Sequence, residues 1–127
     1  MYVGFASGQR GNANRLDLNR NFPDLRFPGR QIGQLQPETI ALMNFSLSHH
    51  FVLSANFHGG SVVANYPYDG NYNQRSGVAD RTSDDEFFRY ASLVYSNNHQ
   101  TMHLSTEFPN GITNGAQWLV RVDRSLH

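Results

Sequence analysis

The sequence contains no cysteine and no lysine. Without cysteine the chain can form no disulfide and no thiolate metal site, so its composition leaves the redox compartment open. Any metal would have to be held by histidine and carboxylate side chains. The basic residues are ten arginines, which balance ten acidic residues and leave a formal net charge of zero. A neutral chain lacks the positive field that draws nucleic acids or anionic membranes, so we expect neither as a partner.

Long apolar runs are missing as well. No stretch approaches the roughly 20 apolar residues of a membrane-spanning helix, and residues 1–12 lack the charged and apolar regions of a signal peptide. Taken by themselves, these absences predict a soluble, unprocessed chain with no membrane span. Hydrophobic residues make up 39% of the chain and aromatic residues 13%, which is enough for a core, and 127 residues suit one domain.

Two helices are predicted. The first covers residues 37–48, where Pro37 fits a first helical position and apolar residues follow at helical spacing. The second begins at Ser83 and Glu86, which have the spacing of a capping box, and ends near residues 97 or 98.

Short apolar runs between turn signals predict strands at residues 51–57 and 61–68, and a weak alternation suggests another at residues 1–7. Strands that alternate with helices indicate an α/β fold, with a mixed, largely parallel sheet flanked by helices.

The string DLNRNFP at residues 17–23 carries the strongest chemical signal. It places the amide of Asn19 beside the guanidinium of Arg20, a combination that suits a free carboxylate held bidentately. The plain alternative is a solvated loop. Two further strings occur in the same chain, NFHGGS at residues 56–61 and FPNGITNGAQW at residues 108–118.

In this order, the three strings resemble those of the zinc metallocarboxypeptidases, in the branch that contains carboxypeptidases D, E, M and N. The resemblance assigns residues 1–118 to an internal part of such a catalytic domain and leaves residues 119–127 as an unmatched tail. It implies an enzyme that removes C-terminal residues from peptides and proteins, outside the cell or in the secretory pathway.

The resemblance also implies a role for five residues. Arg10 would polarise the scissile carbonyl and stabilise its oxyanion, while Asn19 and Arg20 would anchor the terminal carboxylate. His58 would be one zinc ligand. Asp69 would line the specificity pocket and select C-terminal Arg or Lys, although Asp69 and Gly70 also form an ordinary turn dipeptide.

The zinc site implied by the resemblance is incomplete in this sequence. The family supplies a second histidine and a glutamate from an HxxE motif, which is absent here, and the matched segment also lacks the family's general-base glutamate and substrate-closing tyrosine. His58 is therefore a lone ligand for Zn²⁺. His99 and His103, spaced i, i+4, are an alternative metal pair.

We therefore expect this polypeptide alone to be inactive. Two other readings stay open: a non-catalytic module that binds peptide C-termini, and a truncated product without a stable fold. Cooperative unfolding would distinguish the last of these from the others.

Overall fold

The structure is a computed structural model that describes residues 10–24, 32–70 and 77–118. The chain divides into two compact units, Met1–Phe57 and His58–His127. The expected strand at residues 1–7 and the tail at residues 119–127 lie outside the described residues. Within the described ranges, no helix is both long and apolar enough to cross a bilayer.

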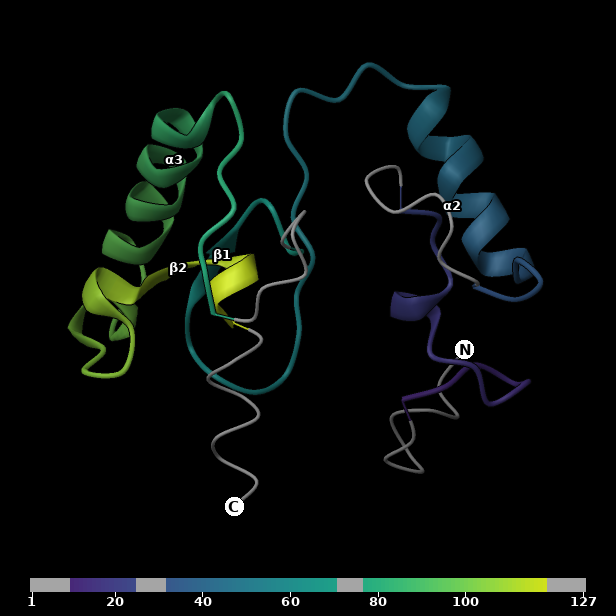
Figure 1. The fold of residues 1–127 in the computed structure, drawn as a ribbon, viewed down its shortest axis with the longest axis horizontal. Coiled ribbons are helices and arrows are strands. Elements are labelled where there is room, and N and C mark those ends of the chain that lie inside the picture. Colours follow the sequence, from purple (N-terminus) through teal and green to yellow (C-terminus); the bar gives the residue numbers. More distant parts are fainter. Residues whose placement is uncertain (1–9, 25–31, 71–76, 119–127) are drawn as a thin grey trace. The chain divides into compact units, whose positions relative to one another are not determined.

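The first unit contains the 3-10 helix η1 (Leu18–Arg20) and the helix α2 (Pro37–Leu47), shown in Figure 1. Helix α2 confirms the prediction for residues 37–48, with proline in its first turn as expected. At its C-terminal end, Nδ1 of His49 lies 2.8 Å from the carbonyl oxygen of Phe45, so this histidine caps the helix. Thr39 is the buried residue of α2, and its large apolar side chains Ile40, Leu42, Phe45 and Leu47 are exposed.

Asn21 connects η1 to the start of α2. Its side chain is buried, and its Oδ1 accepts hydrogen bonds from the backbone N–H of Gln36 and the hydroxyl of Thr39, both at 2.8 Å. Its Nδ2 donates to the carbonyl oxygens of Ile32 and Gln34, both at 3.1 Å. The amide thus has a partner for each hydrogen and two for its oxygen, which is the condition for burying it without penalty.

A tight turn precedes η1. The N–H of Arg15 donates to the carbonyl of Asn12 at 2.8 Å, and the side chain of Asn12 accepts from the N–H groups of Asn14 and Leu16. Arg15 has a φ of +60°, the left-handed region that favours glycine. Gly11 packs against this residue so closely that a Cβ atom there would lie 2.7 Å from the carbonyl carbon of Arg15.

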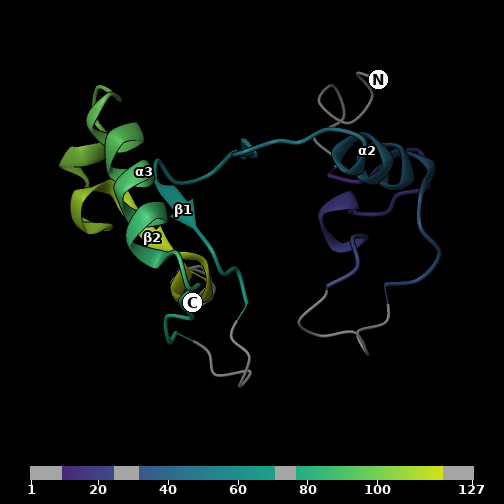
Figure 2. The ribbon, with the colours of Figure 1, turned by 90° about the horizontal axis from the view of Figure 1, so that it is seen from above.

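The second unit is built on two parallel strands, β1 (Ala64–Tyr66) and β2 (Ile112–Asn114). Ala64 pairs with Ile112, which sets the register. Helix α3 (Asp85–Asn97) lies against both strands, as Figures 1 and 2 show. The 3-10 helices η2 (Met102–Leu104) and η3 (Pro109–Gly111) connect α3 to β2.

The parallel pair and its covering helix confirm an α/β fold. Strand β1 is shorter than the strand predicted at residues 61–68. The strand predicted at residues 51–57 is wrong: no described segment pairs with these residues, and Val52 and Phe57 are 92% and 82% exposed. An apolar run becomes a strand only where a neighbouring strand accepts its backbone hydrogen bonds, and a single-segment pattern cannot supply that neighbour.

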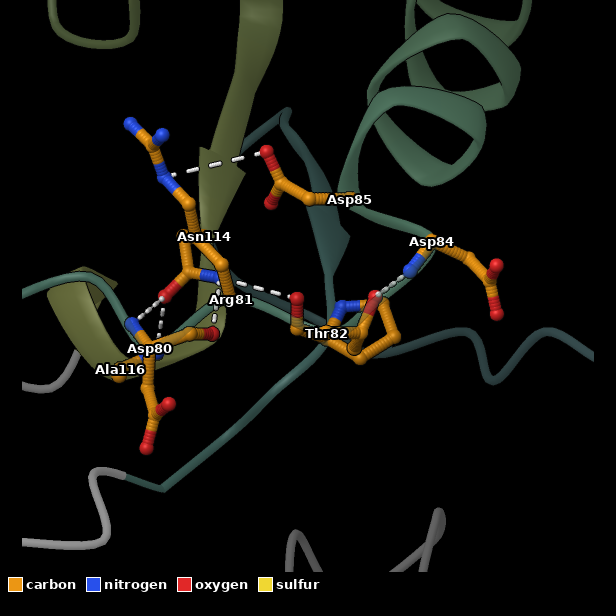
Figure 3. Close-up of polar contacts among 8 residues, drawn as sticks. Asp80, Arg81, Thr82, Asp84, Asp85, Asn114 and Ala116 are labelled. Carbon is orange, nitrogen blue, oxygen red and sulfur yellow. Dashed lines mark hydrogen bonds and ion pairs between the residues drawn. The ribbon is translucent and has the colours of Figure 1, made fainter.

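Helix α3 begins without the predicted capping box. Its N-cap is Asp84, not Ser83, and the Ser83 hydroxyl lies 3.5 Å from the Asp84 carboxylate. The hydroxyl of Thr82 accepts from the N–H of Asp84 at 3.1 Å instead, a contact drawn in Figure 3. Asp85 and Glu86 occupy the first turn, where negative charge is stabilised by the helix dipole.

Asn114 ends β2 and joins it to two other segments (Figure 3). Its Nδ2 donates to the carbonyl oxygens of Pro67, at 2.9 Å, and Asp80, at 3.0 Å. Its Oδ1 accepts from the N–H groups of Asp80, at 3.0 Å, and Ala116, at 3.2 Å. This buried amide therefore connects the strand to the loop after β1 and to the segment before α3.

The apolar core of the described residues is small. Its buried hydrophobic residues are Met102, Phe108 and Ala116, and the ring of Trp118 stacks on Phe108 at 5.2 Å between centroids. Trp118 is the single tryptophan of the chain, so its fluorescence reports on the second unit.

Replacing Asn114 by alanine removes its side-chain hydrogen bonds to the backbone of Pro67, Asp80 and Ala116. We expect the free energy of unfolding of the second unit to fall by about 2 to 4 kcal/mol, because buried donors and acceptors are left unpaired. Urea titration followed by Trp118 fluorescence measures this loss. Asn97→Ala, at an exposed position of α3, is the matched control and should change little. Equal urea midpoints for the two variants, or no cooperative transition in the unsubstituted chain, would contradict the role given to Asn114.

Replacing Arg15 by glycine should stabilise the turn, because glycine adopts positive φ without the steric cost that arginine carries there. We expect about 0.5 to 1 kcal/mol, seen as a two- to five-fold slower amide hydrogen exchange at Asn12 and Arg15, whose N–H groups close the turn. Ala13→Gly is the control, since Ala13 has no positive φ and glycine there should speed the exchange. Faster exchange in both variants would contradict the prediction.

Candidate functional site

Arg10 forms an ion pair with Asp17. Its Nε donates to Oδ2 of Asp17 at 2.7 Å, and the two side chains are 60% and 30% exposed. The bond uses Nε, so the two terminal nitrogens of the guanidinium have no partner among the residues that the structure describes. The result is a cation that is oriented by one bond and open to solvent.

Asp17 also organises the turn that carries the other two predicted residues. Its Oδ1 accepts from the N–H of Asn19 at 2.9 Å, and its carbonyl oxygen accepts from the N–H of Arg20 at 2.9 Å. This makes Asp17 the N-cap of η1. Both Asn19 and Arg20 are exposed, and Nη1 of Arg20 lies 3.3 Å from the carbonyl oxygen of Asn19.

The first unit therefore brings Arg10, Asn19 and Arg20 together around one residue, Asp17. Each of the three has a hydrogen bond to Asp17, through a side chain in one case and through the backbone in two. An exposed amide next to an exposed guanidinium can hold a carboxylate, while a second guanidinium is available for another oxygen.

His58 lies at the first position of the second unit, followed by Gly59 and Gly60. Its side chain is exposed and has no hydrogen bond to another described residue. Within residues 10–24, 32–70 and 77–118, no three histidine or carboxylate side chains gather closely enough to hold a metal ion. The described residues thus do not form a complete zinc site, because such a site needs three protein ligands.

His99 and His103, the alternative metal pair, have local hydrogen bonds. Nδ1 of His99 accepts from the N–H groups of Thr101 and Met102, both at 3.2 Å, and Nδ1 of His103 lies 3.1 Å from the carbonyl oxygen of His99. These bonds hold the turn after α3. The described part of the chain adds no third ligand to the pair.

Asp69 follows the carboxyl end of β1, where ligands of α/β sheets commonly bind. Its carboxylate is exposed, and Oδ1 accepts from Nδ2 of Asn65 at 3.3 Å. The backbone beside it is fixed, because the carbonyl of Tyr68 accepts from the N–H of Ala116 at 2.8 Å. Gly115 packs against Asp69 so closely that a Cβ atom at position 115 would lie 2.7 Å from the Cα of Asp69.

The predicted site residues fall in both units: Arg10, Asn19 and Arg20 in the first, His58 and Asp69 in the second. No sequence motif discussed above assigns a role to Asp17, which has a hydrogen bond with each of the three residues of the first group. An aspartate directly before a short helical turn is a common N-cap signal and could have identified it.

Comparison with known proteins places these observations in a family. The family model for zinc carboxypeptidases matches residues 5–125. Carboxypeptidase SOL1 of Arabidopsis thaliana is 47% identical over 116 residues, which cover 91% of this chain and 23% of the relative. Carboxypeptidase D of Drosophila melanogaster is 45% identical over 130 residues, covering 86% of this chain and 9% of the relative.

The catalytic chain of carboxypeptidase N from Rattus norvegicus is 44% identical over 135 residues, covering 86% of this chain and 30% of the relative. The chain thus spans less than a third of the length of each of these relatives. The family match includes the residues around Asp17 and around Asp69 whose geometry is given above. This chain belongs to the zinc carboxypeptidase family.

Proposed function

We propose that this chain carries the part of a zinc carboxypeptidase that recognises the C-terminal residue of a peptide, in a parent protein that removes this residue. The observation that supports the proposal best is the arrangement of Arg10, Asn19 and Arg20, which are all bonded to Asp17 and all exposed.

In this proposal, the amide of Asn19 and the guanidinium of Arg20 bind the terminal carboxylate of the peptide. Charge-assisted hydrogen bonds of this kind are stronger than neutral ones and fix the orientation of the bound group. Arg10 faces the carbonyl oxygen of the bond to be cleaved, where negative charge develops during hydrolysis. An arginine suits this task because it keeps its charge at any working pH.

Hydrolysis needs groups that the described residues do not supply. His58 is the predicted metal ligand here, and a single imidazole does not make a zinc site. The sequence has no HxxE motif to complete it. The chain by itself is therefore inactive in this proposal, and the cleavage belongs to the parent protein. The same facts favour, as a second candidate, a module that binds peptide C-termini without cleaving them.

The substrate class follows from Asp69. Its exposed carboxylate at the end of β1 would attract a basic side chain, so the proposal gives the parent enzyme a preference for C-terminal Arg or Lys. A location in the secretory pathway or outside the cell, which the resemblance implies, is part of the same proposal.

The first test uses the purified chain with a short peptide that ends in Arg, the same peptide amidated, and an Ala-ended control. We expect no release of Arg and an affinity for the free acid about 10- to 100-fold above that for the amide, since the amide offers no charge to Arg20. Arg20→Ala should remove this difference. Arg89→Ala, at an exposed position of α3, is the control and should preserve it.

Two results would overturn parts of this proposal. Release of Arg by the pure chain with about one bound zinc would reject the inactivity and the ligand assignment. Equal affinity for the acid and the amide would reject the recognition of a peptide C-terminus by either candidate.

A second test concerns Asp69. Gly115→Ala would place a methyl group against the Asp69 carboxylate and backbone, so the carboxylate must move. We expect the preference for the Arg-ended over the Ala-ended peptide to be lost, and the second unit to be destabilised by about 1 to 3 kcal/mol. Gly59→Ala is the matched control, because a Cβ atom there meets nothing within 4 Å. An unchanged preference in a destabilised Gly115→Ala variant would argue against Asp69 as the specificity residue.

A further inference from the structure

We propose that Asp17 is the positioning residue of this recognition site, whose one carboxylate sets the orientation of Arg10 and the conformation of the Asn19–Arg20 turn together. This inference rests on the proposed function, which gives Arg10, Asn19 and Arg20 their roles.

The two oxygens of the Asp17 carboxylate have different partners. Oδ2 accepts from Nε of Arg10 at 2.7 Å, a short charge-assisted bond. Oδ1 accepts from the N–H of Asn19 at 2.9 Å and so caps η1. The rotation of this one carboxylate therefore determines where the guanidinium lies relative to the turn.

Stability is not the main effect of the ion pair. Arg10 is 60% exposed and Asp17 30%, and exposed pairs contribute little to folding because water screens them. Orientation is the larger effect, since Arg10 belongs to no helix or strand that would hold it. A bond at Nε also restrains the plane of the guanidinium, and its two terminal nitrogens have no partner among the described residues, so they can donate to a substrate oxygen.

The backbone adds a second link to the same residue. The carbonyl oxygen of Asp17 accepts from the N–H of Arg20 at 2.9 Å, and the N–H of Asn21 donates to the carbonyl of Leu18 at 3.1 Å. The turn is thereby continuous with the buried amide of Asn21, which is the fixed point of the first unit. Through these bonds, Asp17 holds the exposed guanidinium of Arg10 in place relative to the buried side chain of Asn21.

Two variants separate the two halves of this role. In Asp17→Asn the side chain keeps an oxygen that can cap the Asn19 N–H, but it presents no charge to Arg10. In Asp17→Ala both bonds are lost. Asp84→Asn is the control, because it removes an equal charge from an exposed aspartate of the other unit.

The first readout is the order of the Arg10 side chain in the full chain, measured as the ¹⁵N{¹H} NOE of its Nε–H signal. Arg89 is the reference in the same spectrum, since it is exposed and its side chain has no hydrogen bond or ion pair with another described residue. We expect Arg10 to be more ordered than Arg89 in the unsubstituted chain and in Asp84→Asn. In both Asp17 variants, Arg10 should be as mobile as Arg89.

The second readout is the affinity ratio between the Arg-ended peptide acid and its amide. Asp17→Asn should keep this ratio within about two-fold, because the cap persists. Asp17→Ala should lower the ratio about five-fold, which is the affinity change that corresponds to the free energy of a typical N-cap hydrogen bond. A purely structural role for Asp17 would lower the unfolding midpoint without changing either the Arg10 signal or the ratio.

The outcomes distinguish this inference from the proposed function. Arg10 order that is unchanged in Asp17→Asn, or an affinity ratio that is unchanged in Asp17→Ala, would overturn the positioning role. Equal affinity of the unsubstituted chain for the acid and the amide would overturn the proposed function. The Arg10 signal would still decide whether Asp17 orients that guanidinium.

Discussion

Each unit of this chain depends on a buried asparagine amide whose donors and acceptor are all satisfied by backbone or side-chain groups, most of them distant in sequence. Asn21 holds the segment before α2 in the first unit, and Asn114 holds the ends of β1 and β2 in the second. An amide can do this because it offers two donor hydrogens and an oxygen that accepts twice. Burial makes each of these bonds costly to leave unmade, so the backbone segments around the amide have one favourable arrangement.

These polar connections are important because the apolar core of the described residues is small. Helix α3 exposes Phe87, Tyr90 and Val94, and most large apolar residues of α2 are exposed as well. In layered α/β folds such helix faces are buried against a sheet, and here the described sheet has two strands of three residues each. The relatives named above are more than three times the length of this chain.

The buried amides also determine where the chemical groups lie. Asn21 follows η1 directly, so the residues just before it, Asn19 and Arg20, start from a fixed backbone and extend to solvent. Asn114 precedes Gly115, whose lack of a side chain admits the backbone of Asp69. In both units a rigid, buried contact lies next to an exposed charged group, which is how a small scaffold can orient side chains for recognition.

The sequence by itself determined the family, the α/β class and the two helices. Helical periodicity is a local property, and strings such as DLNRNFP and FPNGITNGAQW identify a family without any three-dimensional information. It also predicted roles for Arg10, Asn19 and Arg20, which stay predictions; in the structure each of the three has a hydrogen bond to Asp17.

Only the tertiary structure decided the remaining features. Residues 51–57 have the composition of a strand but no neighbouring strand in the described chain, and Ser83 has the spacing of a capping box while Asp84 occupies the N-cap. The position of Asp17 fits an N-cap, but only the structure shows that its second oxygen binds Arg10. Each of these features depends on a hydrogen-bond partner that a linear pattern does not specify. Some of these partners are distant in sequence, and others are neighbouring residues that compete for the same hydrogen bond.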